Sequence, residues 1–564
     1  MSDIKDTSVH AESVEFVNKT ESGFHKFAHS FTRHELALAK GGDESGAARV
    51  AASPLSRNLK GRHLQMIAIG GSIGTGLFVN SGKTLSNGGP ASVLIAFMII
   101  GVMLYTVVHA LGELAVCIPV AGSFSTFSTR FIDPAWGFAM GWNYAMQWLV
   151  VFPLELVAAS ITLQYWNVPV NKTVWVAIFW TFIVIINLFG VKGYAEAEFA
   201  FSLVKVVSVI MFIIVGIVIN CGGAPEGGYI GGKYWHNPGA FNNGLKGLCA
   251  VFVTAAFAFA GTELVGLASA ETANPRKTLP SAVKQVFWRI TVFYIVALTV
   301  VGLLVPYDSD RLLGASSHVD AAASPFVIAM QGAGLKAFPH VMNAIILIAV
   351  LSVGNSSVYG CSRTLASLAD LGQAPRFLGY IDRAGRPLAA IGVTAVFGLL
   401  GFVCVSPAEG PVFNWLLSLS GLSSIFTWGS ICFAHIRFRA ALRAQGYQLT
   451  DLAFQSQPGV IGSSIGLAIN IFVLGAQIWT AFSPTRGHAT IESVLQDTLT
   501  VPVVIMLFVC YKVWRRTSFV AAADADLVSG RREVDPQVFA TELEAERAEL
   551  ASRGLFYRAY KFWC

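Results

Sequence analysis

Long stretches without a charged side chain are the feature that most constrains the fold of this chain. Residues 91–108, 174–191, 290–306 and 341–362 each contain no Asp, Glu, Lys or Arg. About 20 apolar residues, at 1.5 Å per residue, cross the hydrocarbon layer of a membrane. Only 13% of the residues are charged, about half the fraction that a soluble domain needs to cover its surface. The chain is therefore expected to be an all-α integral membrane protein.

The apolar blocks predict twelve membrane-spanning helices between two polar tails. The tails comprise residues 1–61 and 516–564, and the spans lie within residues 62–515. The loops on the side of the two tails contain thirteen Lys and Arg residues, and the loops on the other side contain seven. Cytoplasmic loops carry the excess of Lys and Arg, so both termini are expected in the cytoplasm. Asn171 in the sequon Asn171-Lys172-Thr173 then lies outside, and its glycosylation is left open. The spans run approximately from 63–81, 90–118, 136–165, 173–191, 198–220, 245–269, 286–306, 338–368, 387–406, 411–434, 460–482 and 496–514.

Charge and cysteine content argue against several other kinds of partner. The net charge of +6 is small for 564 residues, and the basic residues are scattered, so no nucleic-acid partner is expected. The eight cysteines show no metal-ligand spacing, so we interpret them as packing residues and expect no metal and no cofactor.

Glycines interrupt the first and the sixth predicted spans. The first contains Gly70, Gly71, Gly74 and Gly76, and the sixth contains Gly261 and Gly266 around Glu263. Each glycine costs a helix about 1 kcal/mol relative to alanine, and close helix packing is one explanation. If spans 1–5 and 6–10 are two repeats, however, the interruptions fall at corresponding positions. Paired interruptions of this kind point to a binding site at the middle of the membrane.

A broken helix exposes backbone groups that suit a small charged ligand. Amides that begin the second half of span 1, near Thr75 and Gly76, suit a carboxylate. Carbonyl groups that end the first half suit an ammonium group. A zwitterionic amino acid needs both, whereas a small organic cation needs only the carbonyls.

Three charged residues lie in the middle of predicted spans, namely Glu155, Lys205 and Glu263. Each would cost at least about 2.5–3.5 kcal/mol if it faced lipid, so each is expected to face the protein interior. One interpretation is a static salt bridge between Lys205 and one of the two glutamates; the other is a proton relay. Four more charged residues near span ends are interpreted as snorkelling or loop-anchoring groups: Glu113, Lys246, Arg289 and Arg363.

Several motifs resemble the yeast amino acid transporter family, which belongs to the amino acid–polyamine–organocation superfamily. The likeness begins with residues 59–71 (LKGRHLQMIAIGG) and 74–78 (GTGLF), covers roughly residues 57–564, and is strongest to fungal general amino acid permeases. Further similar stretches are Gly112-Glu113-Leu114, Gly261-Thr262-Glu263-Leu264-Val265-Gly266, Asn274-Pro275-Arg276-Lys277, Leu419-Ser420-Gly421-Leu422 and the ending Phe562-Trp563-Cys564.

The resemblance implies a LeuT-like core of five plus five inverted spans, with spans 1 and 6 broken and spans 11 and 12 outside the core. It implies that the substrate carboxylate meets Thr75, Gly76 and nearby amides, and that Lys205 takes the position of a coupling ion. The Phe257 ring is expected to act as a gate. The full set of expected substrate-binding residues is Ser72, Ile73, Gly74, Thr75, Gly76, Gln147, Val151, Phe257, Ala260, Gly261, Thr262 and Ser352, with Glu155, Lys205 and Glu263 as proton-coupling residues.

The function expected from this resemblance is proton-coupled symport of amino acids, with broad specificity, across the plasma membrane. The expected partners are amino acids, protons and membrane lipid, and no enzymatic activity is expected. A receptor of the same fold that signals without transport is the alternative from another class, and a choline or γ-aminobutyrate carrier is a third. Whether a transporter of this kind also signals is left open.

The two tails carry candidate regulatory sites. Lys5, Lys19, Lys26 and Lys40 lie in the polar N-terminal arm and are candidate acceptors for ubiquitin, which makes a ubiquitin ligase a candidate partner. Residues 536–553 are rich in helix formers, and the basic, aromatic segment that follows ends at Cys564. We expect palmitoylation of Cys564 to anchor this segment, because an acyl chain beside a cationic segment supplies two membrane signals. The alternative is that the helix packs on cytoplasmic loops and Cys564 is unmodified.

Overall fold

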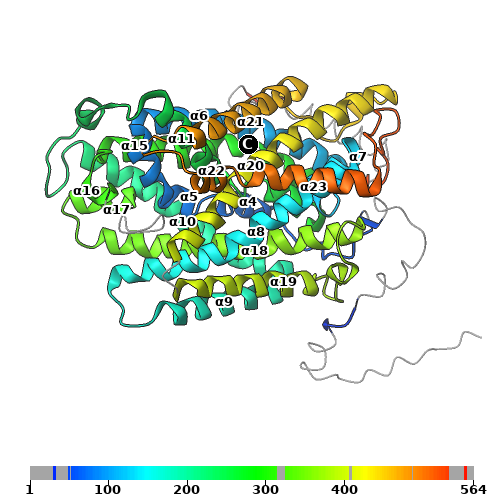
Figure 1. Ribbon diagram of the computed structural model, residues 1–564, viewed down its shortest axis with the longest axis horizontal. Coiled ribbons are helices and arrows are strands. Elements are labelled where there is room, and N and C mark those ends of the chain that lie inside the picture. Colours follow the sequence, from blue (N-terminus) through cyan, green and yellow to red (C-terminus); the bar gives the residue numbers. More distant parts are fainter. Residues whose placement is uncertain are drawn as a thin grey trace, which may run out of the picture.

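Helices laid lengthwise along the molecule make up the fold (Figure 1). The computed structural model describes residues 30–33, 49–50, 52–313, 324–405, 409–485, 487–531 and 552–554. In these residues the β structure is confined to two isolated bridges, Arg33 with Asp382 and Leu59 with Thr272. The prediction of an all-helical membrane fold is confirmed.

The helices account for the twelve predicted crossings. In the described part of the chain, eight helices are long and apolar enough to cross a membrane, and a pair bent by 60° gives a ninth. Two shorter apolar helices and the broken first span supply the other three crossings. In order, the spans are α4 (Gly61–Gly70) with α5 (Thr75–Phe78); α6 (Asn80–Cys117); α8 (Pro134–Leu163); α9 (Lys172–Leu188); α10 (Gly190–Asn220); α11 (Gly244–Phe259) with α12 (Leu264–Leu267); α13 (Pro275–Lys284), α14 (Val286–Arg289) and α15 (Ala297–Leu304); α18 (Phe338–Asp370); α19 (Leu388–Gly398); α20 (Glu409–Ala444); α21 (Gly459–Phe482); and α22 (Ile491–Thr498) with α23 (Thr500–Arg515).

The first turns of α6 belong to span 1 rather than to span 2. Gly89 has φ +77°, which kinks the helix just before Pro90. Span 1 therefore extends to residue 88, several residues beyond its predicted end. The connection between spans 5 and 6 holds the kink, because the Ala91 amide donates to the Ala240 carbonyl at 2.9 Å.

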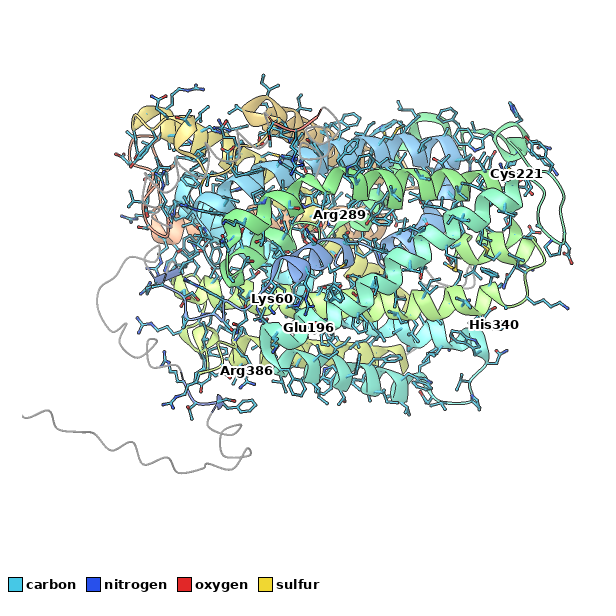
Figure 2. The ribbon with its side chains drawn as sticks, turned by 180° about the vertical axis from the view of Figure 1, so that it is seen from behind. Lys60, Glu196, Cys221, Arg289, His340 and Arg386 are labelled. Atoms are coloured by element: carbon cyan, nitrogen blue, oxygen red, sulfur yellow. The ribbon has the colours of Figure 1, made fainter. Side chains whose placement is uncertain are left out.

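The described parts of the two tails meet the same end of the bundle, which we call the tail face; the other end is the opposite face. Leu59, at the start of span 1, exchanges backbone hydrogen bonds with Glu271 and Ala273 at the end of span 6. Figure 2 shows Lys60 and Arg386 towards the tail face and Cys221 and His340 towards the opposite face. Spans 1 and 6 therefore run in opposite directions, as two inverted repeats require.

The two broken spans touch at their breaks. A Cβ on Gly261, which has φ +94°, would lie 2.3 Å from the Gly71 carbonyl oxygen, and a Cβ on Gly76 would lie 2.4 Å from Cα of Ala258. Only glycine allows this approach of two backbones. The predicted breaks in spans 1 and 6 are confirmed, and their glycines serve both packing and the interruption.

Three of the four charged residues interpreted as snorkelling or loop-anchoring groups are buried, so snorkelling was wrong for them. Glu113 does anchor a loop, because its Oε2 accepts from the Ser456 amide at 2.6 Å. Glu113 is 0%, Arg363 2% and Arg289 6% exposed. Glu113 accepts two hydrogen bonds of 2.6 Å from Arg439, and Arg363 lies 3.3 Å from Glu271. Span 7 carries Arg289 between the two faces of the molecule (Figure 2). Lys246 is part-buried and donates to Ser483 Oγ at 2.5 Å, which fits an anchoring role.

Candidate functional site

The break in span 1 covers residues 71–74. The α4 helix ends at Gly70, and the Ser72 hydroxyl turns back to donate to the Ile69 carbonyl at 3.0 Å. Gly74 has φ −156° and ψ −144°, and the chain re-enters a helix at Thr75. The first amides of α5 have no preceding helical turn to accept from them. They therefore present donors to whatever occupies the break.

A small cavity lies at this break, between spans 1, 3, 6 and 8. Its volume is about 20 Å³, room for roughly one water molecule. An amino acid is much larger, so the cavity has to open to admit one. The lining residues are Gly71, Ser72, Gly74, Thr75, Gly76, Gln147, Trp148, Val151, Glu155, Phe257, Ala260 and Val353.

Most of the predicted binding residues line this cavity. Four do not belong to its lining in the part of the chain that the structure describes: Ile73, Gly261, Thr262 and Ser352. Ile73 packs in the hydrophobic core, and the Thr262 hydroxyl donates to the Phe259 carbonyl at 2.8 Å. Ser352, expected at the side-chain end of the pocket, points elsewhere, and Val353 lines the cavity in its place. The sequence analysis missed Gly71, Trp148 and Val353.

Phe257 separates this cavity from a larger one nearer the opposite face. The larger cavity has a volume of about 220 Å³, and Phe257 lines both. Its walls come from spans 1, 6, 10, 11 and 12 and include Asn80, Lys83 and Asp497. The ring therefore lies between a roomy vestibule and the break.

Glu155 is the acidic side chain in the wall of the small cavity. It is 1% exposed, and its Oε2 accepts a hydrogen bond from the Thr75 hydroxyl. The hydroxyl of Thr75 is therefore committed to Glu155, whereas its backbone amide is presented to the break. Gln147, also in the wall, donates to Ser424 Oγ at 2.9 Å.

Tyr294 of span 7 ties the two breaks together. Its hydroxyl lies 2.9 Å from the Ser72 carbonyl oxygen and 2.9 Å from the Ala258 carbonyl oxygen. It lies in a π-helical segment, Ile290–Val296, a distortion that is common at functional sites. The sequence analysis missed Tyr294, because it lies in an uninterrupted apolar run.

Glu263 forms a cluster of its own at the break in span 6. Its carboxylate accepts from the Gly261 amide, the Tyr144 hydroxyl and Trp428 Nε1, each at 3.2 Å. These donors satisfy the carboxylate without a cation. The sequence grouped Glu263 with Lys205, but the structure gives the two residues different partners.

Lys205 is held by span 1 and span 8. Its Nζ donates to the Gly70 carbonyl at 2.5 Å and to Ser352 Oγ at 2.6 Å. The carboxylate within 4 Å of this ammonium belongs to Glu198, at 3.9 Å, and not to Glu155 or Glu263. The sequence analysis missed Glu198, although it lies seven residues before Lys205, on the same helical face.

The predicted modification sites Lys5, Lys19, Lys26, Lys40 and Cys564 lie outside the residues that the structure describes, as does most of the predicted helix at 536–553. Across the described ranges, no group of three or more His, Cys, Asp or Glu residues is placed to hold a metal ion.

Comparison with known proteins gives a consistent family. The family model described as amino acid permease matches residues 63–522. The general amino-acid permease GAP2 of Candida albicans is 57% identical over 552 residues, which is 96% of this chain and 94% of that protein. The general amino-acid permease GAP1 of Saccharomyces cerevisiae is 54% identical over 529 residues, 92% of this chain and 88% of that protein. In a solved structure, the nucleobase–cation–symport-1 family transporter MHP1 aligns with a TM-score of 0.45 at 15% identity, over 79% of this chain and 98% of that chain.

Proposed function

The chain belongs to the amino acid permease family, and on that premise we propose that it imports amino acids of many kinds across the plasma membrane by symport with protons. The observation that carries the proposal is the cavity at the break of span 1, which combines helix-end amides, backbone carbonyls and the buried carboxylate of Glu155. Such a set of groups suits a small zwitterion that travels with a proton.

The substrate carboxylate binds at the start of α5 and its ammonium group at the end of α4. The amides of Thr75 and Gly76 point along the α5 axis, where the helix dipole favours negative charge. The carbonyls of Ser72, Phe257 and Ala260 supply acceptors for the ammonium group. Phe257 moves aside to connect the vestibule with the break.

Proton coupling uses Glu155 and Lys205. Glu155 lies in the cavity wall, and Lys205 holds the last carbonyl of α4. A protonation change at either residue therefore alters a group that touches the broken helix. Glu263, which three neutral donors satisfy, holds the shape of span 6.

Broad selectivity follows from the rest of the wall. Gln147, Trp148, Val151 and Val353 carry no charge. Without a fixed charge to oppose a charged side chain, discrimination depends on volume and a few hydrogen bonds, worth about 1–3 kcal/mol each.

The test is uptake of a panel of radiolabelled amino acids by permease-deficient cells, with and without a protonophore. One charge crossing 100 mV yields about 2.3 kcal/mol, and one pH unit adds about 1.4 kcal/mol. At one proton per substrate this supports roughly 500-fold accumulation. Uptake that continues after the membrane potential and the pH difference are both collapsed would indicate exchange or facilitated diffusion instead of symport. Binding without uptake would favour the receptor, and exclusive uptake of arginine or lysine would refute broad selectivity.

A further inference from the structure

Lys205 stands at the start of a buried hydrogen-bond chain that leads towards the tail face. The Lys205 ammonium donates to Ser352 Oγ at 2.6 Å, and this hydroxyl donates to Glu198 Oε1 at 2.5 Å. All three side chains are 0% exposed. The serine hydroxyl thus connects a proton donor to a proton acceptor that lies 3.9 Å away.

Glu198 lies on the tail-face side of Lys205. The two residues are seven positions apart on α10 (Gly190–Asn220), which begins at the tail face (Figure 2), where Arg386 donates to the Leu188 carbonyl at 2.7 Å. Seven residues of α-helix separate the two backbone positions by about 10 Å, although the charged groups themselves come within 3.9 Å of each other. A proton that moves from Lys205 to Glu198 therefore passes to the side chain whose backbone lies nearer the tail face.

Glu198 also packs directly against the broken helix. A Cβ on Gly70 would lie 2.2 Å from Glu198 Oε1. The same glycine offers its carbonyl to Lys205 at 2.5 Å. The last residue of α4 therefore contacts both ends of the chain of three side chains.

The other groups around Glu198 are polar or paired. Asn355 and Ser356 of span 8 face its carboxylate, and Ser356 Oγ lies 3.2 Å from the Tyr194 hydroxyl. Tyr194 stacks on Tyr359 at 4.1 Å. The Tyr359 hydroxyl donates to Glu271 at 2.6 Å, and Arg363 neutralises Glu271. On the cavity side, the charge of Glu155 acts on Lys205.

We infer that Glu198 is the residue that takes the coupled proton from Lys205 and releases it at the tail face. The inference rests on the proposed symport. In the step, an N–H bond of the Lys205 ammonium breaks as its proton binds Ser352 Oγ, and the serine proton passes to Glu198 Oε1. The products are a neutral amine, an intact serine and a carboxylic acid, so no charge is created.

Movement of α4 supplies the trigger. While α4 is in place, the Gly70 carbonyl stabilises the ammonium form of Lys205. When α4 swings away to open the site towards the tail face, the ammonium loses that acceptor. Two buried charges are then costlier than two neutral groups, and the proton moves to Glu198. The same movement uncovers Glu198, because Gly70 no longer covers its carboxylate.

The experiment uses purified full-length protein in liposomes, with labelled L-leucine as the probe. Accumulation is measured under an imposed proton gradient, counterflow exchange without a gradient, and proton entry with an internal pH dye. The variants are Glu198→Gln, Ser352→Ala and Ser352→Thr. Ser208→Ala is the matched control, because Ser208 is a buried serine of α10, the helix that carries Glu198 and Lys205, and its hydroxyl donates to the Val204 carbonyl of that helix.

We expect Glu198→Gln and Ser352→Ala to accumulate leucine at least tenfold less than the wild type and to lose leucine-dependent proton entry. Counterflow exchange, which needs no net proton movement, should stay within about threefold. Ser352→Thr, which restores a hydroxyl, should recover accumulation relative to Ser352→Ala, and Ser208→Ala should behave as the wild type.

Wild-type accumulation and proton entry in Glu198→Gln would overturn the inference and leave Glu198 as a static partner of Lys205. Equal loss of exchange and accumulation in a folded variant would also overturn it, since binding rather than proton transfer would then depend on Glu198. If Glu198→Gln does not fold, the same criteria apply to Ser352→Ala. A wild type that shows no gradient-driven accumulation would instead refute the proposed function.

Discussion

Thr75 contributes two different groups to the site, a backbone amide at the start of α5 and a hydroxyl bound to Glu155. Thr75→Ala removes the hydroxyl and the γ-methyl group but keeps the amide, and Thr75→Ser removes the methyl group alone. Because Glu155 in the cavity wall then loses this donor in Thr75→Ala, we expect apparent affinity to fall, by no more than the free energy of one charge-assisted hydrogen bond, about 1.5–3 kcal/mol. Thr75→Ser, the control, should stay near the wild type. Competition against a labelled amino acid measures both, and equal affinities of the Ala and Ser variants would show that the hydroxyl does not matter.

The carboxylate site itself is tested with ligands. Amino-acid methyl esters lack the charge that the amides of Thr75 and Gly76 would bind, so they should compete poorly for uptake. An ester that inhibits as strongly as its parent amino acid would place the carboxylate elsewhere.

Gly76 is constrained by the protein backbone as well as by the substrate. Because its Cβ would lie 2.4 Å from Cα of Ala258, even Gly76→Ala should push spans 1 and 6 apart. We expect loss of uptake together with a lower Tm in detergent. Gly392→Ala is the control, since nothing lies within 4 Å of a Cβ there. A Gly76→Ala variant with normal Tm and normal uptake would contradict the close packing of the two breaks.

The broken helices depend on a third element for their geometry. Span 7 places one hydroxyl, that of Tyr294, within 2.9 Å of carbonyls from both breaks. Tyr294→Phe leaves these buried acceptors without a donor, which costs about 1–3 kcal/mol. We expect a lower Tm and weaker substrate binding, measured by thermal unfolding with and without substrate.

Tyr307→Phe provides the comparison for this experiment. Tyr307 is a part-buried tyrosine on span 7's loop, and its hydroxyl donates to one carbonyl, that of Pro238, at 3.3 Å. Loss of the Tyr307 hydroxyl should leave substrate binding unchanged. If both variants behave alike, the contact of Tyr294 with the breaks has no special role.

Hydropathy and glycine placement predicted the spans and their breaks, because both are properties of single segments. Charge in mid-span correctly indicated that Glu155, Lys205 and Glu263 face the interior. Partner choice was not predictable in the same way. Lys205 has Ser352 as a neighbour because of how span 8 is rotated against span 5, and helical periodicity fixes a face but not the residue of another helix that the face meets. Nothing in the sequence indicated Tyr294 either, because its partners lie on other helices. Glu198 differs, since it shares a face of span 5 with Lys205 and the spacing of seven residues could have indicated it.

The C-terminal segment 517–531 is bound to the tail face. The Thr517 hydroxyl donates to Asp133 at 2.7 Å, and Gln445 donates to the Ala525 carbonyl at 2.7 Å. Arg130 donates to the Ser529 carbonyl at 2.6 Å and lies 3.9 Å from Asp526. These contacts join the segment to the connection between spans 2 and 3 and to span 10. The segment therefore belongs to the folded body, although the sequence placed it in a polar tail.

The carboxyl group of Asp526 allows a prediction of how docking of this segment depends on pH. Burial alone would raise the pKa of its carboxyl, but hydrogen bonds from Ser529, the charge of Arg130 and the Val528 amide together keep that pKa below its usual value. A lowered pKa means that the contribution to docking is present above the free value, about 3.9, and is lost as pH falls through the lowered one. Between pH 6.0 and 7.5 the segment should therefore stay docked, with equal hydrogen-exchange protection of residues 519–531 after correction for intrinsic rates. Asp526→Asn should speed exchange at both pH values, and release of the wild-type segment within this range would assign the contact to another titrating group.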